Sequence, residues 1–167
     1  MKKNILCLDL GKGSLGLAIS RSGMFISPLT NLRFHAGDYD ECIKLLMKEI
    51  RNETVEHICI GLPLYPSGDP CEMTPIVDMF IEKISPLFPN VDINKVDERY
   101  STVEASDMLR SNNKNSKKQK KNIDSAAAMV ILERYLKLYK LGGKVFVHKN
   151  KQKKHLPIRK EISNNNI

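Results

Sequence analysis

The fold is decided by the stretch NILCLDLGKGSLGLAIS, residues 4–20, near the start of the chain. The apolar run over residues 4–10 has the length of a buried strand, and one acid, Asp9, interrupts it near its end. The glycines that follow let the backbone reverse tightly after Asp9. Residues 15–20 then supply a second apolar strand. The stretch therefore predicts two neighbouring antiparallel strands, with a carboxylate at the end of the first.

The rest of the chain alternates between strand and helix patterns. A turn at Arg21-Ser22-Gly23 leads into a third extended segment that ends near Phe34. The later strands are predicted over residues 55–61 and 91–96, and the helices over residues 40–51, 73–84, 101–110 and 123–139. Alternating helices and strands indicate parallel strands joined by right-handed crossovers. We therefore expect an α/β fold with a mixed five-stranded sheet, three antiparallel strands and then parallel ones, and helices on both faces.

The charge of the chain is unevenly distributed. Its 167 residues correspond to one domain, and its net charge is +8. Residues 114–121 hold five lysines and residues 144–160 hold seven basic residues, both without acids, whereas the remainder has 15 basic and 19 acidic side chains. We expect a domain over residues 1–141, with a mobile basic loop over 112–121, and a flexible, basic and polar extension over 142–167.

The two basic stretches favour a polyanionic partner. Clustered lysines neutralise phosphates and release their counterions, so nucleic acid is the favoured ligand and solvated surface charge is the alternative. The sequence has no run of about 18 apolar residues, so no membrane span is predicted. Asp9 interrupts the first apolar run too early for a secretory signal. The four cysteines form no CxxC pair, so structural zinc is not expected. The sequence predicts a soluble cytoplasmic protein with no membrane partner.

A glycine motif after the first strand suggests a cofactor that its context excludes. Residues 11–16, GKGSLG, match the GxGxxG fingerprint of dinucleotide-binding folds, and Asp38 follows at a suitable distance. The third glycine of that fingerprint opens a helix of about ten residues. Here Leu17-Ala18-Ile19-Ser20 runs into Ser22-Gly23 instead, so we expect a tight turn and no dinucleotide.

Acidic residues lie at the ends of three predicted elements. Asp9 ends the first strand, where a carboxylate in an apolar run must be hydrogen-bonded, paired or metal-bound. Asp97 and Glu98 follow the last strand, and Asp124 opens the last helix beside small residues at 125–128 that let this helix approach the sheet near Asp9. Ordinary roles compete with metal binding: turn hydrogen bonds at Asp9, charge before a helix at 97–98, and the helix dipole at Asp124.

Convergence of these carboxylates would require cations. Their mutual repulsion must be neutralised, and hard oxygen ligands select Mg²⁺ or Mn²⁺. Two such ions about 4 Å apart can activate a water and stabilise the leaving oxygen in phosphodiester hydrolysis. The basic stretches would then hold the backbone of the nucleic acid, so carboxylates and lysines together predict a metal-dependent nuclease.

Four stretches of this sequence resemble one family. They are CLDLG at 7–11 with GLA at 16–18, IGLPL at 60–64 with Gly68, DERYSTVEA at 97–105, and IDSAAA at 123–128 with IL at 131–132. Over residues 4–139 the chain resembles the YqgF (RuvX) family, described as Holliday-junction-resolvase-like proteins and as pre-16S ribosomal RNA nucleases. Where this family often has an aromatic residue and a threonine after the first aspartate, this chain has Leu10 and Lys12.

The resemblance implies an RNase H-like fold and an endonuclease that trims the 5′ end of precursor 16S ribosomal RNA. The family's acidic site falls on Asp9, Glu98 and Asp124, as catalytic residues and ligands of Mg²⁺ or Mn²⁺, and Asp97 is the alternative to Glu98. The candidate contacts with the nucleic-acid backbone are Lys12, Arg99, Lys117, Lys118, Lys120 and Lys121.

Two other functions remain open at this point. A Holliday-junction-type resolvase of branched DNA would use the same carboxylates and would need two active sites related by two-fold symmetry, hence a homodimer and not a monomer. A non-catalytic RNA-binding factor in assembly of the small ribosomal subunit would tolerate Asp9→Asn. Structured RNA is the expected partner of both the nuclease and the assembly factor.

Overall fold

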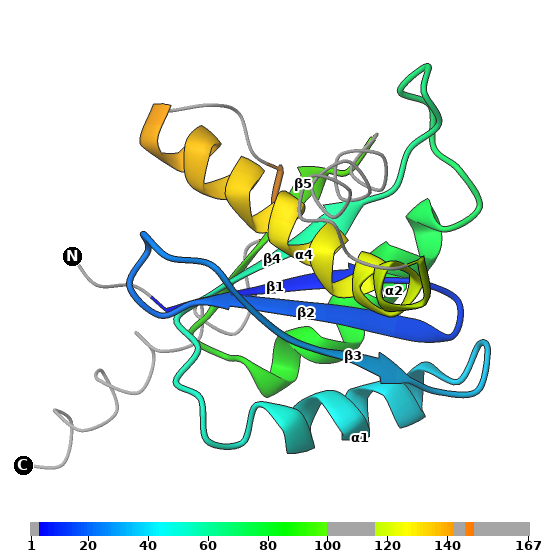
Figure 1. Cartoon of the computed structure of the whole chain (residues 1–167), viewed down its shortest axis with the longest axis horizontal. Coiled ribbons are helices and arrows are strands. Elements are labelled where there is room, and N and C mark those ends of the chain that lie inside the picture. The colour runs from blue at the N-terminus through cyan, green and yellow to red at the C-terminus, as the bar shows by residue number, and fades with distance from the viewer. Residues whose placement is uncertain (1–3, 100–115, 142–145, 149–167) are drawn as a thin grey trace, which may run out of the picture.

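The computed structural model describes residues 4–99, 116–141 and 146–148, which form a six-stranded sheet flanked by helices (Figure 1). The strand order is β3-β2-β1-β4-β5-β6. The elements are β1 (Ile5–Leu10), β2 (Ser14–Ser20), β3 (Ser27–Arg33), α1 (Tyr39–Glu49), β4 (His57–Leu62), α2 (Thr74–Ile84), the short 3-10 helix η1 (Ser85–Leu87), β5 (Asp92–Asp97), α4 (Ser116–Leu141) and β6 (Phe146–His148).

The pairing of the strands confirms the predicted mixed sheet. β1 pairs antiparallel with β2, and β2 pairs antiparallel with β3. On its other side β1 pairs parallel with β4, which pairs parallel with β5. The five strands expected from the sequence are therefore all present, and they have the expected order of antiparallel and then parallel pairing.

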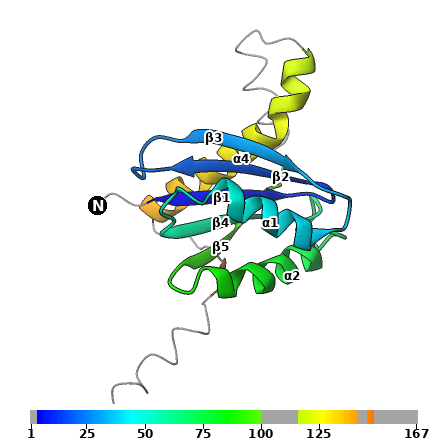
Figure 2. The same cartoon turned by 90° about the horizontal axis from the view of Figure 1, so that it is seen from below.

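The side chains of β1 contribute to two separate cores because they alternate between the faces of the sheet. Leu6 and Leu8 pack in the core beneath α1 and α2, whereas Cys7 packs with Ile131 of α4 in a second core. Figures 1 and 2 show α1 and α2 on one side of the sheet and α4 on the other, as predicted. Asp9 follows Cys7 by two residues, so it belongs to the α4 face of β1.

Helix α4 begins earlier than the sequence pattern indicates. It starts at Ser116, so the predicted loop over 112–121 is wrong for residues 116–121, and residues 112–115 lie outside the described chain. Lysine and glutamine are good helix formers, and no glycine or proline occurs between Ser116 and Leu141. A polar, lysine-rich composition is therefore compatible with a helix here and does not by itself indicate a loop. The helix expected over 101–110 lies outside the described residues.

A sixth strand was not expected. β6 pairs antiparallel with β5, from Ile93↔His148 to Lys95↔Phe146. It falls within residues 142–167, which the sequence assigned to a flexible extension. The remainder of that segment, 142–145 and 149–167, lies outside the described residues, and the domain boundary at 141 stays a prediction.

The turn between β1 and β2 contains no helix. The Gly11 N–H donates to the Ser14 carbonyl oxygen over 2.8 Å, and β2 starts at Ser14. The predicted tight turn is therefore confirmed, and the third glycine, Gly16, lies in a strand and does not open a helix. Within the described ranges, none of the helices is long and apolar enough to cross a membrane.

Candidate active site

The ends of three parallel strands bring two of the predicted acids together. Cys7 lies opposite Cys59 in the β1–β4 pair, and Gly61 lies opposite Val96 in the β4–β5 pair. Cys7, Cys59 and Val96 all pack in the core on the α4 face. Two residues further along each strand come Asp9, Gly61 and Glu98, and by the two-residue period of strands these positions share that face.

Gly61 leaves the space that the Glu98 carboxylate occupies. A Cβ atom at position 61 would lie 2.2 Å from Oε2 of Glu98 and 2.9 Å from Cδ1 of Ile131 in α4. The carboxyl group of Glu98 therefore lies directly over the backbone of β4, beneath α4. The Glu98 N–H donates to the Leu62 carbonyl oxygen over 3.2 Å, which holds this end of the β5 segment against β4.

Glu98 and Asp9 interact directly. Burial is the largest cause, and together with the negative charge of Asp9 and a hydrogen bond between the two carboxyl groups it raises the pKa of Glu98 to about 8. Smaller contributions come from Cys71 and Asp97. Two carboxyl groups at this separation cannot both ionise easily, so without a cation they share a proton. This pair is the central electrostatic feature of the site.

Asp97 has a different environment from Glu98. Arg99 donates from Nε and Nη2 to Oδ2 of Asp97 over 2.8 and 2.6 Å, and its backbone N–H donates to Oδ1 over 3.0 Å. Burial alone would raise the pKa of Asp97, but these hydrogen bonds and the charges of Arg99 and Arg134 outweigh it and lower the pKa. The structure thus pairs Asp97 with an arginine and brings Glu98 to Asp9.

Asp124 lies inside α4 and not at its beginning. The helix starts eight residues earlier, at Ser116, so the prediction that Asp124 opens it is wrong, and a helix-dipole role no longer accounts for this acid. Asp124 precedes Ile131 by seven residues, almost two turns, so both positions share one side of the helix. The side chain of Asp124 lies outside the described part of the structure, and its convergence with Asp9 stays a prediction.

The carboxylate pair fits a divalent cation. Its oxygens are hard ligands of the kind that Mg²⁺ and Mn²⁺ prefer, and a cation would relieve the repulsion that raises the pKa of Glu98. Among the described residues, no group of three histidine, cysteine or acidic side chains gathers as a metal site. A third protein ligand would therefore have to come from outside this described set, and Asp124 is the sequence-predicted candidate.

The predicted nucleic-acid contacts come from three parts of the chain: the β1–β2 turn, the residue pair after β5 and the start of α4. Nζ of Lys12, in the β1–β2 turn, lies 3.2 Å from Oε2 of Glu72 in an exposed ion pair. Arg99 holds Asp97 and also donates from Nη1 to the Pro66 carbonyl oxygen over 3.2 Å. The other four candidates belong to the first turns of α4, and their side chains lie outside the described structure; they are Lys117, Lys118, Lys120 and Lys121.

Sequence reasoning missed two residues of this region. Gly61 is one of them, and its signal in the sequence is that an isolated glycine inside a buried strand indicates a close approach to the backbone. Arg134 donates from Nη1 to the carbonyl oxygens of Asp97 and Arg99, both over 3.0 Å. No sequence pattern distinguishes this arginine from the other charged residues of the helix.

Comparisons with known proteins point to one family. The family model described as "RuvX: Holliday junction resolvase" matches residues 3–138. A protein of Aster yellows witches'-broom phytoplasma named "Putative pre-16S rRNA nuclease" is 34% identical over 147 residues, 88% of this chain and 93% of its own length. A protein of the same name from Mycoplasma capricolum is 35% identical over 144 residues, 84% of this chain and 100% of its own.

A solved structure shares the fold. The structure described as T. thermophilus RuvC in complex with Holliday junction substrate matches with a TM-score of 0.54 and 11% identity, over 87% of this chain and 99% of its own. This likeness supports the RNase H-like fold that the sequence resemblance implied. Because the family model matches most of the chain and two relatives align along most of their own length, the chain belongs to the RuvX family.

Proposed function

We propose that this chain is a divalent-metal-dependent endonuclease that processes the 5′ end of precursor 16S ribosomal RNA. The observation that carries the proposal is the Asp9–Glu98 pair, which two strand ends hold together over Gly61. Its RuvX-family membership and relatives named as pre-16S rRNA nucleases support the substrate. A ribosomal precursor as substrate implies that the protein works in the cytoplasm.

The acidic residues would hold the cation and the basic residues the RNA. Asp9 and Glu98, with Asp124, would bind Mg²⁺ or Mn²⁺. The bound ion supplies activation of the attacking water and stabilisation of charge at the scissile phosphate. Asp97 orients Arg99 at the rim of the site, where its guanidinium can contact a phosphate. Lys12 and the lysines at the start of α4 would hold the flanking backbone.

Such backbone contacts position a substrate without reading its sequence. Specificity would then come from the shape of the RNA or from the small ribosomal subunit that presents it. Cleavage of a branched DNA junction is the second candidate, favoured by the description of the matching family and by the RuvC fold. That activity would need a two-fold homodimer.

A cleavage assay separates these functions. A precursor 16S RNA fragment and a four-way DNA junction are each incubated with the full chain and Mn²⁺, with and without excess chelator. We expect RNA cleavage that chelator and Asp9→Asn both abolish, while RNA binding is retained.

Asp40→Asn is the matched control, because Asp40 is an exposed acid of α1 that pairs with Lys83 across a 2.7 Å contact and should not affect cleavage. RNA cleavage that persists in Asp9→Asn or in chelator would contradict the metal mechanism. Binding without any cleavage would favour the non-catalytic assembly factor.

A further inference from the structure

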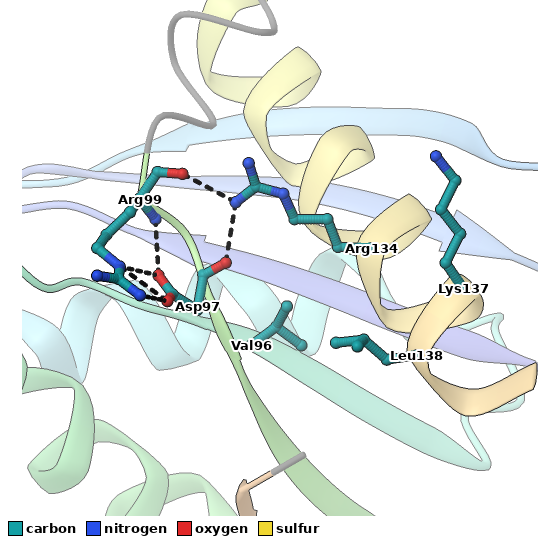
Figure 3. Close-up of a pocket in the computed structure, with 6 residues that line it drawn as sticks. All are labelled: Val96, Asp97, Arg99, Arg134, Lys137 and Leu138. Carbon is teal, nitrogen blue, oxygen red and sulfur yellow. Dashed lines mark hydrogen bonds and ion pairs between the residues drawn. The ribbon is translucent and has the colours of Figure 1, made fainter. Parts of the chain in front are cut away.

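A cavity of about 580 Å³ opens between the end of β5 and the C-terminal half of α4 (Figure 3). Val96 and Leu138 lie close together as an apolar floor, and Arg134 extends from α4 toward Asp97 and Arg99. Lys137 also lines the cavity and extends from α4 in a different direction. The remaining described lining residues, Asp97 and Arg99, flank Glu98 in the chain. The cavity is therefore next to the candidate active site.

The lining of this cavity has an excess of positive charge. Three of its described side chains are cationic and one, Asp97, is acidic. The Asp97 carboxylate accepts hydrogen bonds from both Nε and Nη2 of Arg99, so its charge is compensated locally. Arg134 and Lys137 add two further cations, and the described part of the lining holds no second carboxylate. This electrostatic environment suits an anion.

Both α4 cations make contacts that orient them beside the cavity. Nη1 of Arg134 donates to the carbonyl oxygens of Asp97 and Arg99, each 3.0 Å away, which holds the guanidinium next to the end of β5. Lys137 forms an ion pair of 3.1 Å with Glu133, one turn earlier. The side chains of Lys137 and Glu133 are 70% and 46% exposed. Ion pairs this exposed contribute little to stability, so a phosphate can replace Glu133 as the partner of Lys137.

We propose that this cavity, which lies beside the end of β5, binds a backbone phosphate of the nucleic-acid strand next to the scissile bond. Arg134 and Lys137 would be the ligands of this phosphate. The apolar floor gives the sugar or base of the same nucleotide a surface to contact. The inference rests on the proposed nuclease function, because it takes the cleaved strand as the ligand. A free mononucleotide has the same phosphate chemistry, and the test separates the two.

The test is RNA binding measured by fluorescence anisotropy in excess chelator, so that no cleavage is needed. The probe is a fluorescein-labelled RNA hairpin with single-stranded 5′ and 3′ extensions, titrated over a range of salt concentrations. Lys137→Ala should weaken binding several-fold and reduce the slope of log affinity against log salt by about 0.7, the value for one phosphate contact on a single strand. Lys137→Arg should restore both.

Lys83→Ala is the matched control, because it removes one lysine from α2 on the opposite face of the sheet, where Nζ pairs with Asp40. An unchanged slope in Lys137→Ala, or an equal change in both variants, overturns the proposal. The proposal is also overturned if Lys137→Ala loses binding to labelled adenosine monophosphate while its binding to RNA is unchanged. A wild-type protein that never cleaves RNA, yet shows the Lys137 effect, would refute the nuclease function and leave the phosphate site supported.

Discussion

Replacing Gly61 by alanine tests the candidate site at its most crowded point. The added Cβ would lie 2.2 Å from Oε2 of Glu98 and 2.9 Å from Cδ1 of Ile131, and real Cβ contacts essentially never fall under 3.0 Å. The Ile131 side chain is fully buried and has little room to withdraw. The Glu98 carboxyl group is therefore the part that must move, by about 0.8 Å if 3.0 Å is to be reached.

The size of the effect follows from this displacement. Overpacking of this kind costs about 1–3 kcal/mol of unfolding free energy. For a chain of this length the melting temperature should fall by about 2–12 °C. A displacement of about 1 Å at a catalytic group reduces the rate by about 100-fold. We therefore expect Gly61→Ala to fold, with modestly reduced stability, and to lose nearly all cleavage of precursor RNA.

Gly23→Ala provides the control for lost stability. Gly23 lies in the β2–β3 turn with φ of +74°, and a Cβ there would meet no atom within 4 Å. The strain of a left-handed residue costs about 1–2 kcal/mol, so this variant should melt earlier but cleave normally. Thermal melts and single-turnover cleavage rates of both variants make the comparison. Cleavage by Gly61→Ala within about threefold of wild type would refute the placement of Glu98 in the active site.

The remaining predictions concern charge. In excess chelator, the wild-type melting temperature should fall as pH rises from 5 to 8, because folded Glu98 keeps its proton up to about pH 8 while the unfolded residue loses it near 4.5. Glu98→Gln should remove most of this slope, and a slope of equal size in the variant would exclude Glu98 as its source. At pH 8, Mn²⁺ should raise the melting temperature of the wild type but not of Glu98→Gln, because only the wild type has the Glu98 carboxylate whose charge the ion compensates. Calorimetry with and without Mn²⁺ checks this prediction. Arg99→Ala should cost about 0.5–1 kcal/mol of stability, because Asp97 loses its ion pair. It should also raise KM for RNA more than it lowers kcat, because the proposed phosphate contact is removed. A change in kcat alone would argue against a phosphate contact of Arg99. Alanine at all four basic positions in the first turns of α4 should reduce the salt slope of RNA binding by up to about 3, and an unaltered slope would count against phosphate contacts there; the four are Lys117, Lys118, Lys120 and Lys121.

Much of the fold could be predicted from hydrophobic periodicity. The run Ile5-Leu6-Cys7-Leu8 is buried on both faces, as a strand in the middle of a covered sheet must be. Asp9 could be located for the same reason, because a carboxylate is tolerated only where the apolar run ends. The pairing of strands then followed from their order along the chain.

Other features had no periodic signal. The polar start of α4 carries no apolar stripe, so helix propensity alone determined it and composition suggested a loop. The choice between Asp97, the last residue of β5, and Glu98, which follows it, depends on which side of the sheet each side chain lies on, and the contacts with β4 fix that. β6 has three residues, too few for a pattern, and it depends on the exposed edge of β5.

Strand β6 has a consequence for handling the protein. It pairs with the backbone groups of residues 93–95, and a chain shortened at residue 141 would leave these groups unpaired at the sheet edge. An unpaired edge strand can pair with the edge of another chain, which leads to aggregation. The opposite border, β3, carries Pro28, which lacks an N–H donor and discourages such stacking. Trimming the carboxyl-terminal segment for crystallisation should therefore yield a more aggregation-prone sample than the 167-residue chain.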